Sequence, residues 1–236
     1  IQTLKPVKTA IPRNERKATK MAKRNSGAHG FELPDGTPVP GVTTVLGNLG
    51  WKSYGLMYWA WNLGKQGKDF RDERDKAAEV GTVCHAWASA DIAGKKRPEF
   101  DLPEDMAKKA SDSFQAFVDW RAMTRLDLIA TELALVSEKH KFGGRLDAIA
   151  VWEGAPRLID FKSSKALYPD QIVQVAAYCA LWNEHKPEMK IAGADILRWA
   201  PDGSFAHHAF TLEKLRIGWQ VFTHALALHA LKGELK

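Results

Sequence analysis

The chain has 236 residues, of which 45% are hydrophobic, so it is long and apolar enough for one domain of ordinary size with a sizeable core. No apolar run approaches the ~20 residues of a membrane-spanning helix, and the absence of a P-loop excludes an ATPase motor. The net charge of +6 is uneven, because residues 1–24 hold eight basic residues and one acid while the rest of the chain carries −1.

The basic segment is expected to be a flexible arm over residues 1–28, in front of one folded domain over 29–236. Each lysine or arginine that neutralises a phosphate adds affinity for nucleic acid, so such an arm is typical of nucleic-acid-binding proteins. A tail whose charge serves only solubility fits the composition equally well. A mitochondrial presequence is a third interpretation, although the arm has few apolar residues for an amphipathic helix.

The folded part begins with a predicted short hairpin that turns at Asp35-Gly36, followed by a helix capped by Thr43 or Thr44. The next segment, 51–70, is rich in aromatic residues. Aromatic side chains at helical spacing are more often core than a stacking surface for unpaired bases, so the pattern favours a buried segment. A mixed role stays open, because three lysines are interspersed among five aromatic residues, which are Trp51, Tyr54, Tyr58, Trp59 and Trp61.

Two further helices are predicted over 72–92 and 104–123. The first is interrupted at Gly81-Thr82 and carries His85 on a partly apolar face, where a histidine is usually a hydrogen-bonded core residue. Both cysteines of the chain, Cys84 and Cys179, lie in apolar helical patterns. They are expected to be buried thiols in a reducing compartment.

The central part, after a strand expected over 131–137, concentrates polar residues where a core would require apolar ones. In the predicted strand RLIDFKSS, Asp160 and Lys162 share a face because strand residues alternate between faces. The preceding strand, GRLDAIAVW, places Asp147 alone among apolar residues, and a four-residue EGAP turn joins the two as a hairpin. We therefore expect the two carboxylates and the lysine to converge.

A helix is predicted to follow, with Pro169 at its first position and Gln171, Gln174 and Tyr178 along one face. Two carboxylates on adjacent strands are suited to bind Mg²⁺ or Mn²⁺, which prefer oxygen ligands. The set therefore indicates metal-assisted hydrolysis of a phosphodiester. The alternative is a structural Asp160–Lys162 ion pair, but burying such a pair is costly and rarely stabilises a fold.

The last part is expected to form two strands over 191–200 and 204–212 around a turn at 201–203, then an amphipathic helix from Thr211 to about Gly233. Its histidines have no acidic partner at ligand spacing, and no chemistry is assigned to them: His207, His208, His224 and His229.

Three motifs in this order resemble the GxxD, DxK and QxxxY motifs of the PD-(D/E)XK nuclease superfamily. They are GRLD (144–147), DFK (160–162) and QVAAY (174–178). An upstream GTVCH (81–85) resembles the GTxxH element of the RecB-like exonuclease branch. Within that branch the chain is similar to phage exonucleases and to the mitochondrial genome maintenance exonuclease, over roughly Phe31 to Tyr178.

The resemblance implies a restriction-endonuclease-like α/β fold, with a mixed central sheet of four to five strands drawn from 130–162 and 190–211. Helices 72–92 and 169–185 would flank the site, and helices 104–123 and 212–231 would pack outside. Residues 29–236 would form a single nuclease domain, mainly helical over 29–125, where the helices make a wall over the DNA. Residues 126–236 would hold the sheet core and the closing helix.

The resemblance also implies roles for individual residues. One or two Mg²⁺ or Mn²⁺ ions would be held by Asp147, Asp160, His85 and the backbone carbonyl of Phe161, with Lys162 orienting the water or stabilising the transition state. Gln174 would bond the lysine or the water, and Tyr178 would contact phosphate. Glu132 either supports the metal site or faces solvent. Thr82 is the other supporting candidate, and the expected DNA contacts are Lys52, Arg145, Ser163, Ser164, Lys165 and Tyr178. Two cysteines cannot hold the iron–sulfur cluster that some relatives carry on four.

These features predict a metal-dependent DNA exonuclease that needs a free end and prefers a single strand. It would act in phage or bacterial DNA processing, recombination or repair, in the cytoplasm, with DNA and a phage or host recombination protein as partners and no membrane association. An endonuclease of the same superfamily and an inactive DNA-binding protein on the same scaffold are the alternatives, and the oligomeric state, including a toroidal trimer, is open.

Overall fold

The computed structural model describes residues 30–199 and 204–235. The predicted basic arm and the turn at 201–203 lie outside the described residues. Within them, five strands form one sheet in the order β3 (Leu126–Ser137), β4 (Phe142–Trp152), β5 (Ala155–Ser163), β6 (Gly193–Trp199) and β7 (Phe205–Thr211). Only the β5–β6 pair is parallel, so the sheet is mixed, and the predicted fold class is confirmed.

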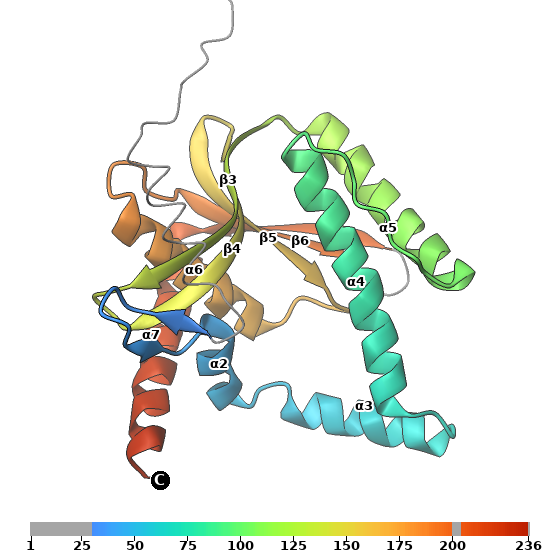
Figure 1. The fold of residues 1–236 in the computed structure, drawn as a ribbon, viewed down its shortest axis with the longest axis horizontal. Coiled ribbons are helices and arrows are strands. Elements are labelled where there is room, and N and C mark those ends of the chain that lie inside the picture. The colour runs from blue at the N-terminus through green and yellow to red at the C-terminus, as the bar shows by residue number, and fades with distance from the viewer. Residues whose placement is uncertain (1–29, 200–203, 236) are drawn as a thin grey trace, which may run out of the picture.

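Helices cover both faces of this sheet (Figure 1). On one face, α6 (Pro169–His185), α7 (Leu212–Glu234) and the short α2 (Val42–Leu46) pack over Leu146, Ile149 and Leu158. On the other face, α4 (Phe70–Ile92) and α5 (Glu104–Met123) pack over Ile159 and Phe161. The alternation of β5 residues between these two cores is what a strand buried on both faces requires. Both cysteines are buried, as predicted.

The buried carboxylate of Asp195 joins three strands of the sheet. It accepts hydrogen bonds from Arg157 Nε at 2.5 Å and Nη2 at 3.1 Å, and its Oδ1 lies 2.8 Å from His207 Nε2. His207 has no acidic partner at ligand spacing along the chain, so the sequence did not reveal this contact. The partner comes from the neighbouring strand β6, which pairs with β7 in the sheet.

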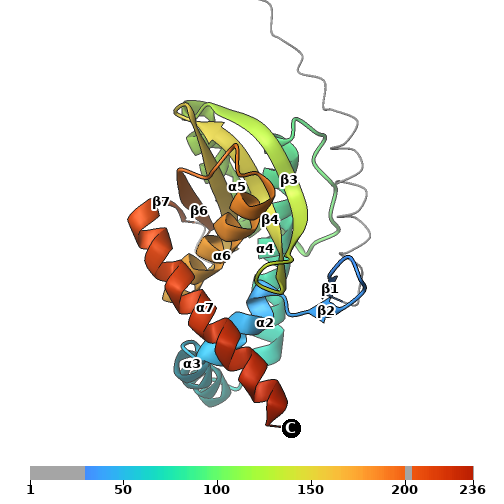
Figure 2. The same cartoon turned by 90° about the vertical axis from the view of Figure 1, so that its left-hand side faces the viewer.

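The N-terminal part begins with the hairpin of β1 (Phe31–Glu32) and β2 (Pro38–Val39), which packs on β4 (Figure 2). The predicted cap at Thr43 or Thr44 is wrong, because α2 begins at Val42 with Gly41 as its N-cap. Gly41 also makes an isolated bridge to Gly143, so the strand pairing ends there and the helix starts at the next residue.

The aromatic segment is exposed, which corrects the expectation of a buried one. After a short 3-10 turn, η1 (Gly47–Leu49), helix α3 (Ser53–Lys65) runs from the region of α2 to α4, away from the sheet (Figure 1). Leu63 is its only buried residue, and Tyr54 is 78% exposed. Helical spacing of aromatics predicts core only when another layer covers the helix, and no described element does so here.

The predicted interruption at Gly81-Thr82 is also absent, since α4 continues through both residues. Gly81 serves packing instead, because a Cβ there would lie 2.1 Å from Ser163 Oγ. The glycine thus allows α4 to approach the end of β5. In the described ranges no helix is long and apolar enough to cross a membrane.

Candidate active site

The predicted catalytic residues meet where strands β4 and β5 part. These strands pair from Trp152–Ala155 at the hairpin end to Ala148–Ile159, and the next position on each strand is Asp147 and Asp160. Beyond it, β4 stays paired with β3 while β5 stays paired with β6, so the two strands diverge (Figure 1). The N–H of Phe161 donates to Asp147 Oδ2 at 2.8 Å, so a carboxylate replaces the missing ladder bond.

A local irregularity in the adjoining pair, β3 and β4, orients the acids. In β4, Leu146 and Ile149 belong to the same core although they are three residues apart, and in β3 the same holds for Ala130 and Leu133. Regular strands would need a spacing of two or four. Glu132, which lies opposite Asp147 in the register, has a left-handed backbone with φ 51°. This conformation is rare for glutamate and costs about 1–3 kcal/mol, and it is often found at functional sites.

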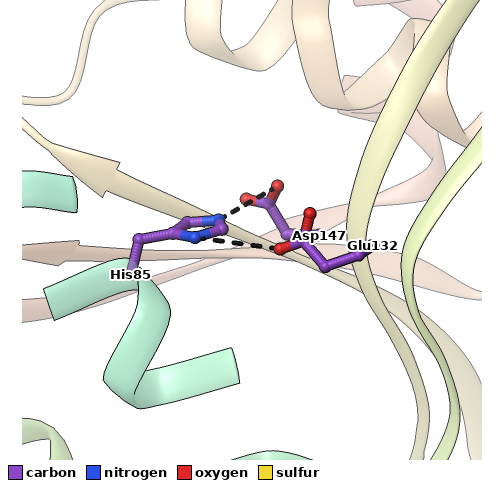
Figure 3. Close-up of side chains that lie close together, drawn as sticks. All are labelled: His85, Glu132 and Asp147. Atoms are coloured by element: carbon purple, nitrogen blue, oxygen red, sulfur yellow. Dashed lines mark ion pairs between the residues drawn. The ribbon is translucent and has the colours of Figure 1, made fainter. Parts of the chain in front are cut away.

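His85 faces both Asp147 and Glu132, and Figure 3 shows its two ring nitrogens directed at the two carboxylates. Its Nε2 is 3.3 Å from Asp147 Oδ1, and its Nδ1 is 3.8 Å from Glu132 Oε1. Helix α4 supplies this side chain, and the ring packs edge-on against Phe161 with 5.2 Å between centroids. Burial by itself would lower the pKa of His85, but the hydrogen bond and charge of Asp147, followed by the charges of Glu132 and Asp160, raise it above its ordinary value.

Asp160 and Lys162 form an ion pair on β5, with 2.5 Å between Asp160 Oδ2 and Lys162 Nζ. The Asp160 side chain is 0% exposed, and neither of its oxygens accepts a hydrogen bond of good geometry from the described residues. Burial raises the pKa of Asp160 to about 6, against the opposing charge of Lys162 and with a further contribution from Asp147. A buried carboxylate that relies on one ammonium contact is costly, so it requires an explanation beyond the fold.

On the α6 side of the sheet, Gln174 Nε2 donates to Tyr178 Oη at 2.8 Å. Tyr178 is 5% exposed, and Gly144 provides the space for it, because a Cβ at Gly144 would lie 2.7 Å from Tyr178 Cε1. Burial, then the charge of Asp160, raises the pKa of Tyr178. The hydroxyl therefore stays protonated and bonded to Gln174. So little exposed surface does not suit the predicted phosphate contact, and Gln174 bonds the tyrosine rather than the lysine.

Other predicted residues lie around this centre. Ser163 and Lys165 are exposed beyond Lys162 on β5, where Ser164 Oγ lies 3.2 Å from Gln171 Nε2. Arg145 is exposed and has its Nη1 3.4 Å from the carbonyl oxygen of Glu132. The hydroxyl of Thr82 donates to the carbonyl of Ala78 in its own helix.

The residues present fit a divalent metal ion. In the described part of the chain, His85, Glu132 and Asp147 form a group whose ligand atoms all lie within 4.8 Å of one another, and this group does not include Asp160. Phe161 directs its N–H toward Asp147, and the N–H and C=O of one strand residue point to the same side, so its carbonyl also faces the site. Oxygen donors with one imidazole suit Mn²⁺, and also Mg²⁺. In this structure Glu132 is therefore a candidate metal ligand and not only a supporting residue.

Comparisons with known proteins address the fold. No protein-family model matches this chain, and no curated protein sequence matches it. Among solved structures, a proposed exonuclease from Eubacterium rectale is similar over 99% of this chain and 89% of its own, with a TM-score of 0.50 and 12% identity. This chain therefore shares that protein's fold.

Further solved structures match over parts of the chain, and the three described next have TM-scores below 0.5. The alkaline exonuclease LHK-Exo from Laribacter hongkongensis matches over 67% of this chain and 91% of its own, with a TM-score of 0.34 and 12% identity. Its complex with dAMP matches over 69% and 93%, with a TM-score of 0.36 and 16% identity. For SSO0001 the match covers 54% of this chain and 61% of that one, with a TM-score of 0.29 and 16% identity.

Proposed function

We propose that this protein is a metal-dependent deoxyribonuclease of the PD-(D/E)XK superfamily, and within it an exonuclease of the RecB-like branch. One observation carries the proposal. Asp160 is fully buried, with the ammonium of Lys162 at 2.5 Å but no hydrogen bond of good geometry from the described residues, at the fork where Asp147, Glu132 and His85 meet. A folding role does not account for this arrangement, whereas a cation brought in with the substrate does. The fold that this chain shares with the proposed exonuclease from Eubacterium rectale supports the proposal.

The metal ligands of this proposal are Asp147, Asp160, His85 and the Phe161 carbonyl, with Glu132 as an additional carboxylate. A bound Mg²⁺ or Mn²⁺ supplies an activated water and neutralises charge on the scissile phosphate. Without the ion, the charges of Asp147 and Glu132 favour the protonated form of His85, which offsets part of their repulsion. Loss of this proton frees both imidazole and carboxylates as ligands.

Lys162 has the position of an electrostatic catalyst. Its side chain is 18% exposed, and its ammonium is held by Asp160 and thus directed to the same fork as the carboxylates. From there it stabilises the negative charge that develops on the phosphate as the water attacks. Gln174 and Tyr178 are positioning residues, because their mutual hydrogen bond fixes the α6 face beside Asp160.

The exposed helix α3 supports binding of a single strand. Trp51, Tyr54, Tyr58 and Trp61 are each at least half exposed. Stacking of unpaired bases on such rings contributes about 1–3 kcal/mol per base without regard to sequence. Two lysines lie beside them, since Lys65 Nζ is 4.4 Å from the Trp61 ring centroid and Lys52 precedes the helix. A DNA single strand that stacks on this surface would place its end at the fork between β4 and β5. Cleavage there would remove nucleotides from that end, which is the action of an exonuclease.

The proposal extends to the whole chain. Residues 29–236 form one nuclease domain, and the basic residues 1–28 add affinity for DNA of any sequence. The activity fits phage or bacterial DNA processing, recombination or repair in the cytoplasm.

The test uses end-labelled linear single-stranded DNA, linear duplex and circular single-stranded DNA, each with Mg²⁺, Mn²⁺ or EDTA. We expect release of short products from the linear single strand with either metal and none with EDTA. Asp147→Asn should abolish the reaction. Asp127→Asn, which changes an exposed aspartate on β3, is the matched control and should not.

Each contrary result has a defined meaning. Rapid cutting of the circle would make the protein an endonuclease of the same fold. Faster digestion of blunt duplex than of single strand would remove the strand preference. Binding of DNA without any cleavage would leave an inactive DNA-binding protein on this scaffold.

A further inference from the structure

A polar turn over residues 163–166 leads from β5 toward α6 at the edge of the proposed active site. It begins directly after Lys162. Past the turn, at the start of α6, Asp170 Oδ2 lies 2.6 Å from Nζ of Lys52, the N-cap of α3. The turn and this ion pair thus connect the fork between β4 and β5 to the exposed aromatic surface of α3. A single strand that stacks on α3 and ends at the fork runs along this connection.

Hydrogen bonds fix the turn at Ser164, and each polar group of this residue has a partner. Its N–H donates to the carbonyl of Trp199 at 2.9 Å, and its hydroxyl donates to the carbonyl of Ala166 at 2.9 Å. Gln171 Nε2 donates to the same hydroxyl at 3.2 Å, and Arg198 Nη1 donates to the Ser164 carbonyl at 2.8 Å. Strand β6 and helix α6 therefore both determine the shape of the turn.

Arg198 makes a second contact with the turn. Its Nη1 also lies 3.1 Å from the carbonyl oxygen of Lys165, so one guanidinium nitrogen bridges two successive carbonyls. Arg198 pairs with Lys162 in the register of the parallel strands, and neighbouring like charges destabilise a sheet. Arg198 Nε is also buried without an acceptor in the described ranges, which adds to the cost. The stability of the sheet alone does not explain an arginine here, whereas the two carbonyls of the turn do.

The residue that this turn presents to solvent is Lys165, which is exposed. Arg198 binds its carbonyl and not its ammonium, so this contact leaves the charge available to a ligand. Lysine is a common donor to the phosphates of DNA, and such contacts position a strand without reading its sequence. Because the turn begins next to Lys162, a phosphate bound by Lys165 is a neighbour of the scissile one.

We propose that Arg198 is a positioning residue, which shapes the turn so that Lys165 binds the phosphate next to the scissile one. Arg198 acts through the backbone of Lys165 and does not contact the DNA. With the carbonyls of the turn held, the lysine side chain starts from a fixed point and reaches a limited volume beside the fork. The inference rests on the proposed function, because it concerns the binding of DNA at that same site.

The experiment is a double-mutant cycle, in which fluorescence anisotropy measures binding of a labelled single-stranded oligodeoxynucleotide to the full chain in EDTA. Lys165→Ala removes one phosphate contact, so we expect the affinity to fall about three- to tenfold and the salt slope to fall by about 0.7. Arg198→Gln should cause a similar loss by itself. In the Lys165→Ala background it should cost less than about twofold, because both substitutions remove the same contact.

The matched control is Arg121→Gln, which should leave the affinity for DNA unchanged. Arg121 Nη1 also donates to a backbone carbonyl, that of Thr124 at 2.5 Å, but near the hairpin end of β4 and β5, opposite the turn. Arg198→Lys is the second variant, for use if Arg198→Gln does not fold. Lysine keeps the charge but is shorter and lacks the planar guanidinium, so it should show a loss of the same kind.

Losses that add in the cycle would overturn the inference, because they would mean that Arg198 contacts DNA directly or acts only through the fold. Wild-type affinity in Arg198→Gln or in Arg198→Lys would overturn it as well. The proposed function is tested separately, since binding in EDTA requires neither metal nor cleavage. Coupled losses without metal-dependent cleavage would retain the role of Arg198 and reject the nuclease, whereas cleavage with additive losses would do the reverse.

Discussion

Replacing Asp160 with asparagine should abolish cleavage and at the same time stabilise the metal-free fold. Asp160 is buried at 0% exposure, and its carboxylate accepts no hydrogen bond of good geometry from residues 30–199 or 204–235. The folded protein therefore bears the cost of a charge that the proposed metal ion, absent before substrate binds, would compensate. Asparagine has nearly the same size and removes that charge.

The magnitude follows from the pKa of Asp160, which is raised from 3.8 to about 6. A rise of about 2 units lowers the free energy of unfolding by about 3 kcal/mol once the group is ionised in both states. Lys162 loses its partner in the variant, which offsets part of this gain. We expect Asp160→Asn to be about 1–2 kcal/mol more stable than the wild type at pH 7.5.

The gain should depend on pH in a defined direction. Below the unfolded pKa of 3.8 the carboxyl is protonated in both states and imposes no cost. The cost grows as the pH rises from about 4 to about 6 and is complete above the folded pKa. The difference between variant and wild type should therefore be larger at pH 7.5 than at pH 5.

The assay is urea unfolding in EDTA, followed by the fluorescence of the nine tryptophans. Asp195→Asn is the matched control, because Asp195 is equally buried but bonded to Arg157 and His207. Breaking that buried pair should destabilise the fold by about 3–5 kcal/mol. The reasoning fails if Asp160→Asn is less stable than the wild type in EDTA, or if it retains more than about a tenth of the wild-type turnover.

Three further predictions concern the same site. Lys162→Ala should lose more turnover than Gln174→Ala, for which about a 10- to 100-fold loss is expected because glutamine acts through Tyr178; equal losses in steady-state assays would contradict this ranking. The rise in melting temperature caused by Mn²⁺ should be larger at pH 7.5 than at pH 5, because the raised pKa values of His85 and Asp160 make protons compete with the ion at low pH. Calorimetric scans that show no such increase would exclude His85 and Asp160 as ligands. Deleting residues 1–24 should weaken DNA binding and flatten its salt dependence while saturated turnover stays unchanged; an unaltered salt slope in filter-binding assays would assign the arm to solubility alone.

Sequence patterns predicted the sheet, its flanking helices and the convergence of Asp147, Asp160 and Lys162. This was possible because strand alternation and a short hairpin are local properties, and local properties decide which residues of β4 and β5 lie opposite one another. The structure also explains the glycines of two motifs. Gly81 leaves space for Ser163, and Gly144 leaves space for Tyr178.

Only the tertiary structure revealed the place of Glu132, the partner of His207 and the exposure of the α3 aromatics. Glu132 itself has a left-handed backbone, which breaks the two-residue alternation of β3 where its carboxylate faces His85. A periodic sequence pattern contains no sign of such a break. His207 finds Asp195 across two paired strands rather than along the chain. Whether an aromatic helix is core depends on a covering layer, and the position of every layer is set by contacts between residues far apart in sequence.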